Sequence, residues 1–207
     1  MKTRVLLVRH GATAFSAEDR FAGSTDIELS DEGRALARRL ADRLAKVKID
    51  AAYCSDLKRT VQTAAIVAAP HGLTAAAVPG LREIDHGQWE GMDHKDVEKK
   101  FADAYAAWSA DPFVNGAPGG ESGLHVLGRA LPALCKIVAD HPGQTVLVVA
   151  HKATNRLMLC SLLGIDPRCY RDRLAQDPAC LNVLDFKGPA QMQATVINDT
   201  SHCGSTV

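Results

Sequence analysis

The chain has 207 residues, 46% of them hydrophobic, and its 24 lysines and arginines balance its 24 aspartates and glutamates. This size and composition predict one domain over residues 1–207, able to bury a core without a metal or a disulfide. Zero formal net charge argues against nucleic acid or an anionic membrane as the main partner, because both attract a positive surplus. The longest apolar run, residues 64–69, is far shorter than the ~20 residues of a membrane-spanning helix.

Six cysteines are scattered along the chain without a C-x-x-C pair, and several lie in apolar segments. This pattern predicts reduced thiols in a reducing compartment. Only residues 5–8 could imitate the apolar core of a signal peptide, and Arg9 interrupts them at once, so we expect a cytoplasmic protein. The sequence does not define the oligomeric state, and a homodimer stays open.

The first predicted element is a buried strand at residues 3–8, an apolar run that ends at Arg9 and His10. This strand delivers a histidine to the point where it passes into a loop. A helix over residues 30–47 follows, since leucines and alanines recur there at helical spacing and Ser30 suits its N-cap.

A short strand at residues 49–54 precedes a second helix, which we expect Ser55 and Asp56 to cap and which ends at Ala69. Arg59 falls in the first turn of this helix. The arginine therefore lies just beyond the end of a strand, as the first histidine does.

The middle of the chain contains a loop at residues 81–87 that is too polar for a core strand and includes Glu83. Helical pieces are predicted at residues 93–110. The glycines and prolines of residues 111–120 then indicate a loop able to cover a site.

The strongest strand signal is the apolar run at residues 145–150, which ends at His151 in the way that the first strand ends at His10. The other helices and strands predicted in this part of the chain lie at residues 121–140, 154–163, 180–186 and 191–197.

Strands that alternate with helices through short connections predict an α/β fold, a three-layer sandwich whose mainly parallel central sheet has helices on both faces. Ligands of such folds bind outside the carboxyl ends of the strands. The residues that we expect to meet at that edge are Arg9, His10, Arg59, Glu83 and His151.

Two arginines and two histidines at one edge would form a local positive pocket, and guanidinium groups match the oxygens of a phosphate. An imidazole there could attack phosphorus, and a carboxyl group could protonate the leaving alkoxide and then deprotonate water. Glu83 is the favoured carboxyl group and Asp85 its rival. No metal or cofactor is expected, because Arg9, Arg59 and His151 supply the charge that Mg²⁺ supplies elsewhere.

Five ordered sequence blocks, which together span nearly the whole chain, resemble the histidine phosphatase superfamily, the phosphoglycerate mutase-like proteins. The blocks are RHGAT at 9–13 with Gly23, Asp26, Leu29, Ser30 and Gly33; SDLKRT at 55–60 with QTA at 62–64; LRE at 81–83 leading to GQWEG at 87–91; PGGES at 118–122; and VVAH at 148–151. Five blocks in this order are far more specific than the RHG tripeptide alone. The resemblance implies a phosphoglycerate mutase-like fold.

The resemblance also implies roles for individual residues. His10 would be the phosphorylated nucleophile, Glu83 the proton donor, and Arg9, Arg59 and His151 the phosphate clamp. The positions that match the family's phosphate and substrate contacts are Thr13, Ser16, Ala22, Gly23 and Lys152.

Two of these positions depart from the family pattern, which often has Asn in place of Ser16 and Gly in place of Lys152. Ser16 keeps a hydroxyl donor with a shorter reach, and Lys152 adds a cation suited to a substrate carboxylate or a second phosphate. Both departures concern the substrate more than the reaction.

These features predict a metal-independent phosphomonoesterase that hydrolyses a small phosphorylated metabolite, such as a sugar or sugar-acid phosphate, through phosphohistidine. The alternatives are a mutase-type phosphotransferase of the same family and a non-catalytic module that binds a phosphorylated ligand. Length favours the phosphatase, since mutases of this resemblance usually carry extra cap sequence. The complete set of five ionisable residues speaks against the binding module.

Overall fold

The computed structural model describes residues 1–17, 20–188 and 191–204, with the side chains of all of these except 16 and 17. The strands are β1 (Thr3–Arg9), β2 (Ala51–Cys54), β3 (Ala76–Ala77), β4 (Thr145–Ala150), β5 (Leu181–Gly188) and β6 (Gln191–Asp199). The α-helices are α1 (Ala14–Ala17), α2 (Asp31–Leu44), α3 (Lys58–Ala68), α4 (His94–Lys100), α5 (Ala102–Ala110), α6 (Gly123–Asp140), α7 (Lys152–Leu163) and α8 (Tyr170–Arg173). Within these described ranges, no helix combines the length and the apolarity needed to cross a bilayer.

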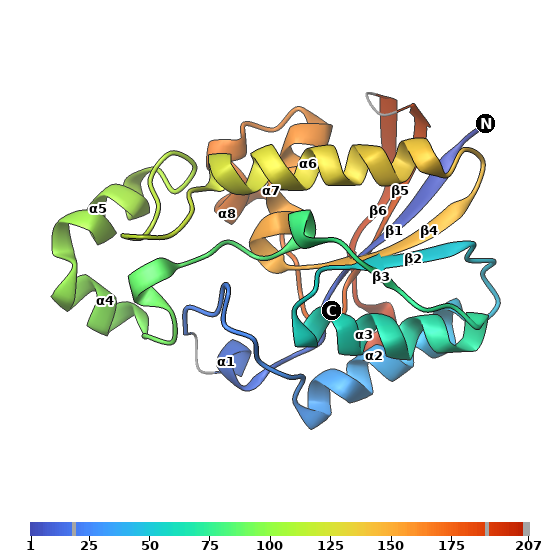
Figure 1. Ribbon diagram of the computed structural model, residues 1–207, viewed down its shortest axis with the longest axis horizontal. Helices are drawn as coiled ribbons and strands as arrows, with labels where there is room; N and C mark the ends of the chain where they lie inside the picture. The colour runs from blue at the N-terminus through green and yellow to red at the C-terminus, as the bar shows by residue number, and fades with distance from the viewer. Residues whose placement is uncertain (18–19, 189–190, 205–207) are drawn as a thin grey trace.

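The strands form one sheet in the order β3-β2-β4-β1-β5-β6 (Figure 1). The first four strands of this order pair in parallel, whereas β5 runs antiparallel to β1 and β6 antiparallel to β5. The predicted α/β fold with a mainly parallel sheet is confirmed. The antiparallel hairpin at one edge extends that sheet.

Helices cover both faces of the sheet, because successive side chains of a strand point to opposite faces and the central strands are apolar on both. Val5 and Leu7 of β1 pack in a core with α6 and α7, whereas Leu6 and Val8 pack in a second core with α2 and α3. The sheet is therefore the middle layer of three.

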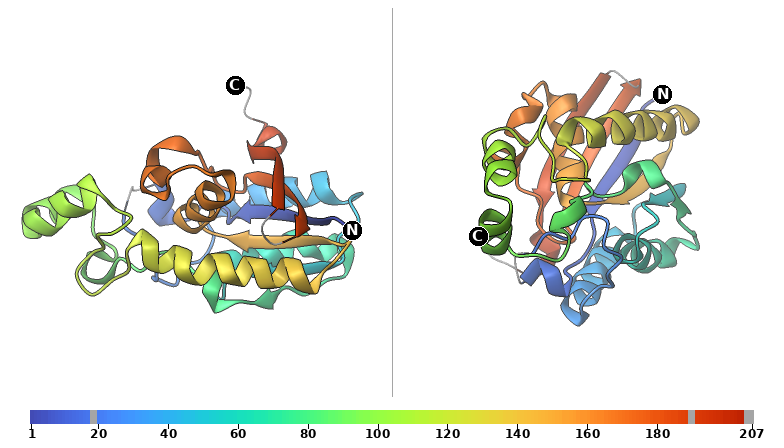
Figure 2. Two further views of the ribbon diagram at one scale, coloured as in Figure 1. Left: turned by 90° about the horizontal axis from the view of Figure 1, so that it is seen from above. Right: turned by 60° about the vertical axis from the view of Figure 1, so that its left-hand side comes forward.

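The carboxyl ends of β1, β4 and β2 lie at the same edge of the sheet, since the three strands are parallel and pair in register. His10, His151 and Ser55 are the residues that follow these strand ends. Helices α4 and α5 project beyond this edge, as the green helices in the left panel of Figure 2 show. The edge and the projecting helices form the two sides of the site described next.

The start of α3 differs from the prediction, which had Ser55 and Asp56 as its cap. The N-cap is Leu57, whose side chain makes no capping hydrogen bond. The Ser55 hydroxyl instead contacts the ring of His151 and the hydroxyl of Thr60. Ser55 resembles a helix cap in the sequence, but its side chain binds His151, the residue after the neighbouring strand β4. By contrast, Ser30 caps α2 as predicted and accepts a hydrogen bond from the Gly33 N–H.

Candidate active site

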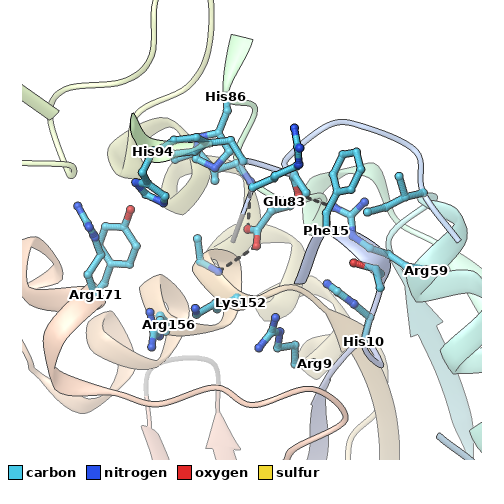
Figure 3. A pocket seen from close by; sticks show the side chains of 18 of the residues that line it. Arg9, His10, Phe15, Arg59, Glu83, His86, His94, Lys152, Arg156 and Arg171 are labelled. Carbon is cyan, nitrogen blue, oxygen red and sulfur yellow. Dashed lines mark hydrogen bonds between the residues drawn. The ribbon is translucent and has the colours of Figure 1, made fainter. Parts of the chain in front are cut away.

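A cavity of about 530 Å³ opens at the carboxyl ends of β1 and β4 (Figure 3). Cavities of this size hold small metabolites. Among the residues predicted for the site, those that line the cavity are Arg9, His10, Thr13, Ala22, Arg59, Glu83 and Lys152.

The orientation of the His10 ring is determined by a hydrogen bond. Its Nδ1 lies 2.7 Å from the carbonyl oxygen of Gly11. A carbonyl oxygen only accepts, so Nδ1 carries the proton and the lone pair of the neutral ring is on Nε2. Burial, and then the charges of Arg59 and Arg9, hold the pKa of His10 well below its usual range, although the bond to Gly11 raises it. The ring is therefore neutral in the ligand-free protein.

His151 packs against His10 at the end of the neighbouring strand. The ring centroids are 5.1 Å apart and the ring planes cross at 62°. Arg59 Nε donates to His151 Nδ1 over 3.2 Å, so the proton of the neutral ring is on Nε2, which donates to Ser55 Oγ over 2.7 Å. Burial and the charge of Arg59 lower the pKa of His151 well below its usual range. The positive charge of the pocket thus comes from arginines, not from the two imidazoles as the sequence had suggested.

The guanidinium group of Arg59 is almost fully held by the protein. Besides its contact with a ring nitrogen, it donates to the carbonyls of Thr25 (2.7 Å) and Gly23 (2.6 Å). The Glu90 carboxylate holds the loop that supplies these carbonyls, because it accepts from the N–H groups of Gly23, Ser24 and Thr25 and from the Thr25 hydroxyl. Burial raises the pKa of Glu90, but these hydrogen bonds outweigh burial and leave the pKa lowered.

Arg9 is buried and only partly paired. One terminal nitrogen donates to the carbonyl of Gln176 over 2.6 Å, whereas its Nε is buried with no partner among the described residues. Burial lowers the pKa of Arg9. A buried charged donor without a partner is costly, so an anion bound in the cavity would satisfy it.

The carboxylate of Glu83 is bound at the first turn of α7. It accepts from the N–H of Ala153 (3.0 Å) and from the N–H (3.1 Å) and hydroxyl (3.0 Å) of Thr154. Its rival Asp85 accepts instead from the Ser24 hydroxyl and the Gly87 N–H and does not line the cavity. Of the two acids considered from the sequence, Glu83 is the one at the cavity.

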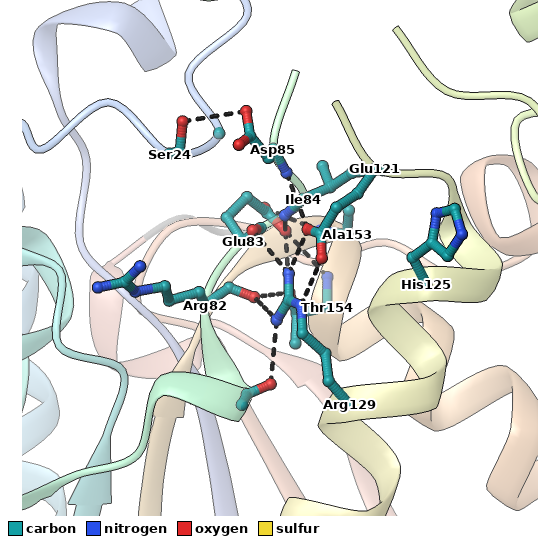
Figure 4. A network of polar contacts seen from close by, with 12 residues as sticks. Ser24, Arg82, Glu83, Ile84, Asp85, Glu121, His125, Arg129, Ala153 and Thr154 are labelled. Carbon is teal, nitrogen blue, oxygen red and sulfur yellow. Dashed lines mark hydrogen bonds and ion pairs between the residues drawn. The ribbon is translucent and has the colours of Figure 1, made fainter. Parts of the chain in front are cut away.

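Arg129 of α6 holds the segment that carries Glu83 (Figure 4). Its terminal nitrogens donate to the backbone carbonyls of Gly80, Arg82 and Glu83 over 2.7–3.0 Å. Two further hydrogen bonds join the same guanidinium to the Glu121 carboxylate. Arg129 therefore positions the Glu83 backbone without touching its carboxyl group.

The other predicted contact residues have different locations. Gly23 is not at the cavity surface but supports Arg59 through its carbonyl. A Cβ at this position would approach the Ile84 carbonyl oxygen to 1.8 Å, which explains the glycine. The backbone of Ser16 belongs to α1, but its side chain is outside the part of the chain that the structure describes.

Three residues that the sequence pattern did not single out also line the cavity. They are His86, His94 and Trp108. Trp108 also packs in an aromatic cluster with Phe21. The expectation that residues 111–120 cover the site is wrong, because none of them lines the cavity and α4 and α5 supply His94 and Trp108 instead.

Arg156 and Arg171 are cavity residues that sequence reasoning did not single out. Arg156 follows Lys152 by one turn of α7, a spacing that places both side chains on one helix face. That spacing was visible in the sequence. Over residues 1–17, 20–188 and 191–204, no three His, Cys, Asp or Glu side chains are grouped so that they could hold a metal ion.

Comparison with known proteins agrees with this architecture. A profile of the histidine phosphatase superfamily (branch 1) matches residues 5–200. Phosphoserine phosphatase 1 of Hydrogenobacter thermophilus is 36% identical over 163 residues, which are 79% of this chain and 77% of that protein. Glucosyl-3-phosphoglycerate phosphatase of Mycolicibacterium vanbaalenii is 34% identical over 170 residues, 78% and 75% of the two chains.

Among solved structures, Bacillus stearothermophilus YhfR superposes with a TM-score of 0.91 at 30% identity and covers 97% of this chain and 98% of its own. The sequence match, the named phosphatases and the shared fold agree with one another. The chain belongs to the histidine phosphatase superfamily and is a phosphatase, a hydrolase of phosphoric monoesters.

Proposed function

We propose that the protein is a metal-independent phosphomonoesterase that hydrolyses a small phosphorylated metabolite through a phosphohistidine at His10. The observation that carries this proposal is the hydrogen bond between His10 Nδ1 and the Gly11 carbonyl. It leaves the lone pair of the ring on Nε2, the atom that must attack phosphorus. The lowered pKa of His10 keeps that lone pair unprotonated at neutral pH.

In the first step, His10 Nε2 forms a bond to phosphorus while the bond from phosphorus to the ester oxygen breaks. The protonated carboxyl group of Glu83 gives its proton to the departing alkoxide. Nδ1 keeps its own proton, which stays bonded to the Gly11 carbonyl. The alcohol leaves, and the phosphoryl group remains on the imidazole.

In the second step, the Glu83 carboxylate takes a proton from water, and the water oxygen attacks phosphorus. The bond between phosphorus and Nε2 breaks, which releases inorganic phosphate and returns Glu83 to its protonated form. In both steps the charges of Arg9 and Arg59 stabilise the phosphoryl oxygens. His151 does not line the cavity, and its ring nitrogens contact Arg59 and Ser55, so its part in the clamp would be to orient the Arg59 guanidinium.

The cavity and the relatives support a substrate class. The cavity suits a small molecule, and Thr13, Ala22 and Lys152 lie on its wall as candidate substrate contacts. The relatives are named for phosphoserine and glucosyl-3-phosphoglycerate, two different phosphorylated metabolites. We therefore propose a sugar, sugar-acid or similar small phosphate ester. A single domain over residues 1–207, a cytoplasmic location and a homodimer stay predictions.

The test uses p-nitrophenyl phosphate with the full chain and with His10→Ala, in the presence and absence of EDTA. We expect phosphate release that survives EDTA and falls at least about a thousandfold in His10→Ala, because the variant lacks the nucleophile. His71→Ala, a histidine outside the cavity, is the matched control and should retain wild-type activity. Mass spectrometry of acid-free quenched samples should find one added phosphoryl group in the wild type alone.

Three results would contradict the proposal. Loss of activity in EDTA that Mg²⁺ restores would require a metal. Interconversion of 3- and 2-phosphoglycerate without net phosphate release would identify a mutase. Inactivity toward a panel of metabolite phosphates, with binding intact, would point to a binding module.

A further inference from the structure

The cavity carries more positive charge than one phosphate group requires. Arg9 and Arg59 face the phosphoryl site, and Arg156 and Arg171 also line the cavity. These two further arginines are a surplus of positive charge over what the phosphoryl group uses. Cations that converge on a partly buried site favour an anionic ligand, so this surplus indicates a ligand with further negative charge.

The surplus is concentrated away from the nucleophile. In Figure 3, Arg156 and Arg171 lie on the side of the cavity opposite His10 and Arg59. They come from α7 and α8, two helices that pack against each other. This second group of cations borders Arg9, whose pKa the charge of Arg156 lowers, and lies away from Arg59.

Arg156 has a hydrogen-bond donor that an anionic ligand could satisfy. Its Nε is buried without a hydrogen-bond partner in the part of the chain that the structure describes. Burial lowers the pKa of Arg156, with the charges of Glu83 and Asp177 opposing this and that of Arg171 adding to it. Buried guanidinium donors are normally satisfied, so an unsatisfied one at a cavity wall is a candidate ligand contact.

Two neighbours complete the arrangement. The guanidinium carbon of Arg171 lies 4.2 Å from the centroid of the Trp108 ring, a cation–π contact that fixes the side chain at the cavity. Burial raises the pKa of Tyr170 to about 12, so its hydroxyl keeps its proton and can donate. Asp172 is exposed and also lines the cavity, and its carboxylate opposes an anion on this side.

The helix geometry sets the spacing between the two anion sites. Glu83 binds the N–H groups of Ala153 and Thr154, which places the ester oxygen that it serves near the first turn of α7. Arg156 lies further along the same helix, about one turn or ~5 Å beyond that point. The charge of Glu83 acts on Arg156, so the two side chains are near enough for one small ester to contact both.

We propose that Arg156, Arg171 and Tyr170 form a subsite for a second anionic group of the substrate, so that the enzyme selects phosphate esters whose alcohol portion carries a carboxylate. The proposal rests on the proposed function for the position of the phosphoryl group. A second phosphate shares the same chemistry and is the other source to be distinguished. Neither the departure at Lys152 nor the phosphate clamp by itself accounts for these three side chains.

The test measures binding in a His10→Asn background, which does not turn over, by titration calorimetry. 3-Phosphoglycerate and glycerol 3-phosphate differ only in a carboxylate against a hydroxymethyl group. We expect the carboxylate to improve affinity at least about tenfold, and Arg156→Met to remove most of that preference, since a charge-assisted hydrogen bond contributes roughly tenfold to a hundredfold. Arg156→Lys keeps the charge but loses the fork and should retain part of the preference.

Arg173→Met is the matched control, because this arginine belongs to the same short helix as Arg171 but is exposed and does not line the cavity. It should leave the preference unchanged. A second comparison measures the affinities for fructose 1,6-bisphosphate and fructose 6-phosphate, which differ in one phosphate group. A preference found only in this comparison, and lost in Arg156→Met, would overturn the carboxylate and assign a second phosphate.

The subsite proposal would be overturned if the His10→Asn background alone bound both ligands of each pair with equal affinity. It would also be overturned if Arg156→Met lowered the affinity for both ligands of a pair by the same factor. Thermal melting of each variant separates these outcomes from unfolding. Hydrolysis of p-nitrophenyl phosphate by the His10-containing chain is measured in parallel. This ester carries no second anionic group, so a chain that does not hydrolyse it would contradict the proposed function. The ratio of the two affinities in each ligand pair would still test the subsite.

Discussion

The inner end of the cavity and its outer side are built differently. At the inner end, His10, His151 and Arg59 make hydrogen bonds to backbone carbonyls, to a serine and to one another. At the outer side, Arg171 rests on an aromatic ring and Arg156 has an unsatisfied nitrogen, a feature that Arg9 shares beside the phosphoryl site. Groups whose rotamers are held by many contacts act at fixed positions, whereas groups with unused donors can adapt to a ligand. The inner end thus suits one reaction, and the outer side suits the choice of substrate.

The largest effect should come from breaking the inner end while keeping its charge. Arg59→Lys retains a cation but cannot reach the His151 ring and two carbonyls with one planar group. We expect kcat for p-nitrophenyl phosphate to fall about 10²- to 10³-fold, as on loss of a preorganised donor. Steady-state kinetics and thermal melting measure this. Arg34→Lys, in an exposed ion pair with Glu28, is the control. A fall of less than threefold would show that charge alone suffices.

A smaller and more selective effect is expected at Arg129, which holds the backbone around Glu83. In Arg129→Met the carboxyl group should be misplaced, so esters whose alkoxide needs a proton should lose about tenfold more activity than p-nitrophenyl phosphate. The nitrophenolate ion leaves without protonation. The ratio of kcat for the two ester types is the measurement, and melting temperature reports the structural cost.

Equal losses for both ester types would contradict this positioning role. The matched control is Arg168→Met, which breaks an exposed ion pair with Asp111 outside the cavity. It should change neither activity nor the ratio.

The two ends of the cavity were not equally predictable from the sequence. Parallel strands end at the same edge of a sheet, so the apolar runs before His10 and His151 sufficed to bring the two rings together. Arg59 was placed correctly for a related reason, since α3 begins just after β2. The family resemblance strengthened these predictions but did not supply the geometry behind them.

The outer side depends on packing that local patterns do not show. Arg171 and Trp108 come from elements far apart in the sequence and meet only because α8 and α5 reach the same cavity. The role of Ser55 was misread because a serine before a helix resembles a cap whether it bonds the helix or a neighbouring ring. The residues around His94 form no pattern that would indicate its place on the cavity wall, because that place depends on where α4 packs.

The smallest expected effect is on the pH dependence of stability, and it compares His10 at the inner end with His86 elsewhere on the cavity wall. Burial and the charges of Arg59 and Arg9 hold the pKa of His10 well below its usual range. Burial also lowers the pKa of His86, but the charges of nearby carboxylates, with Glu90 first among them, oppose that change. Each unfolded histidine gains a proton near pH ~6.5 and the folded one does not, so the unfolded state binds more protons below that pH. The free energy of unfolding must therefore decrease as pH falls below ~6.5, by at most about 1.4 kcal/mol per pH unit for each ring. Denaturant unfolding measures this free energy at pH values from 7 to 5. The free energy of unfolding should depend less on pH in His10→Gln than in the wild type. The reduction should be smaller in His86→Gln, because carboxylates oppose the pKa shift only at His86. Equal flattening in the two variants would contradict the stronger effect of Arg59 and Arg9 on His10.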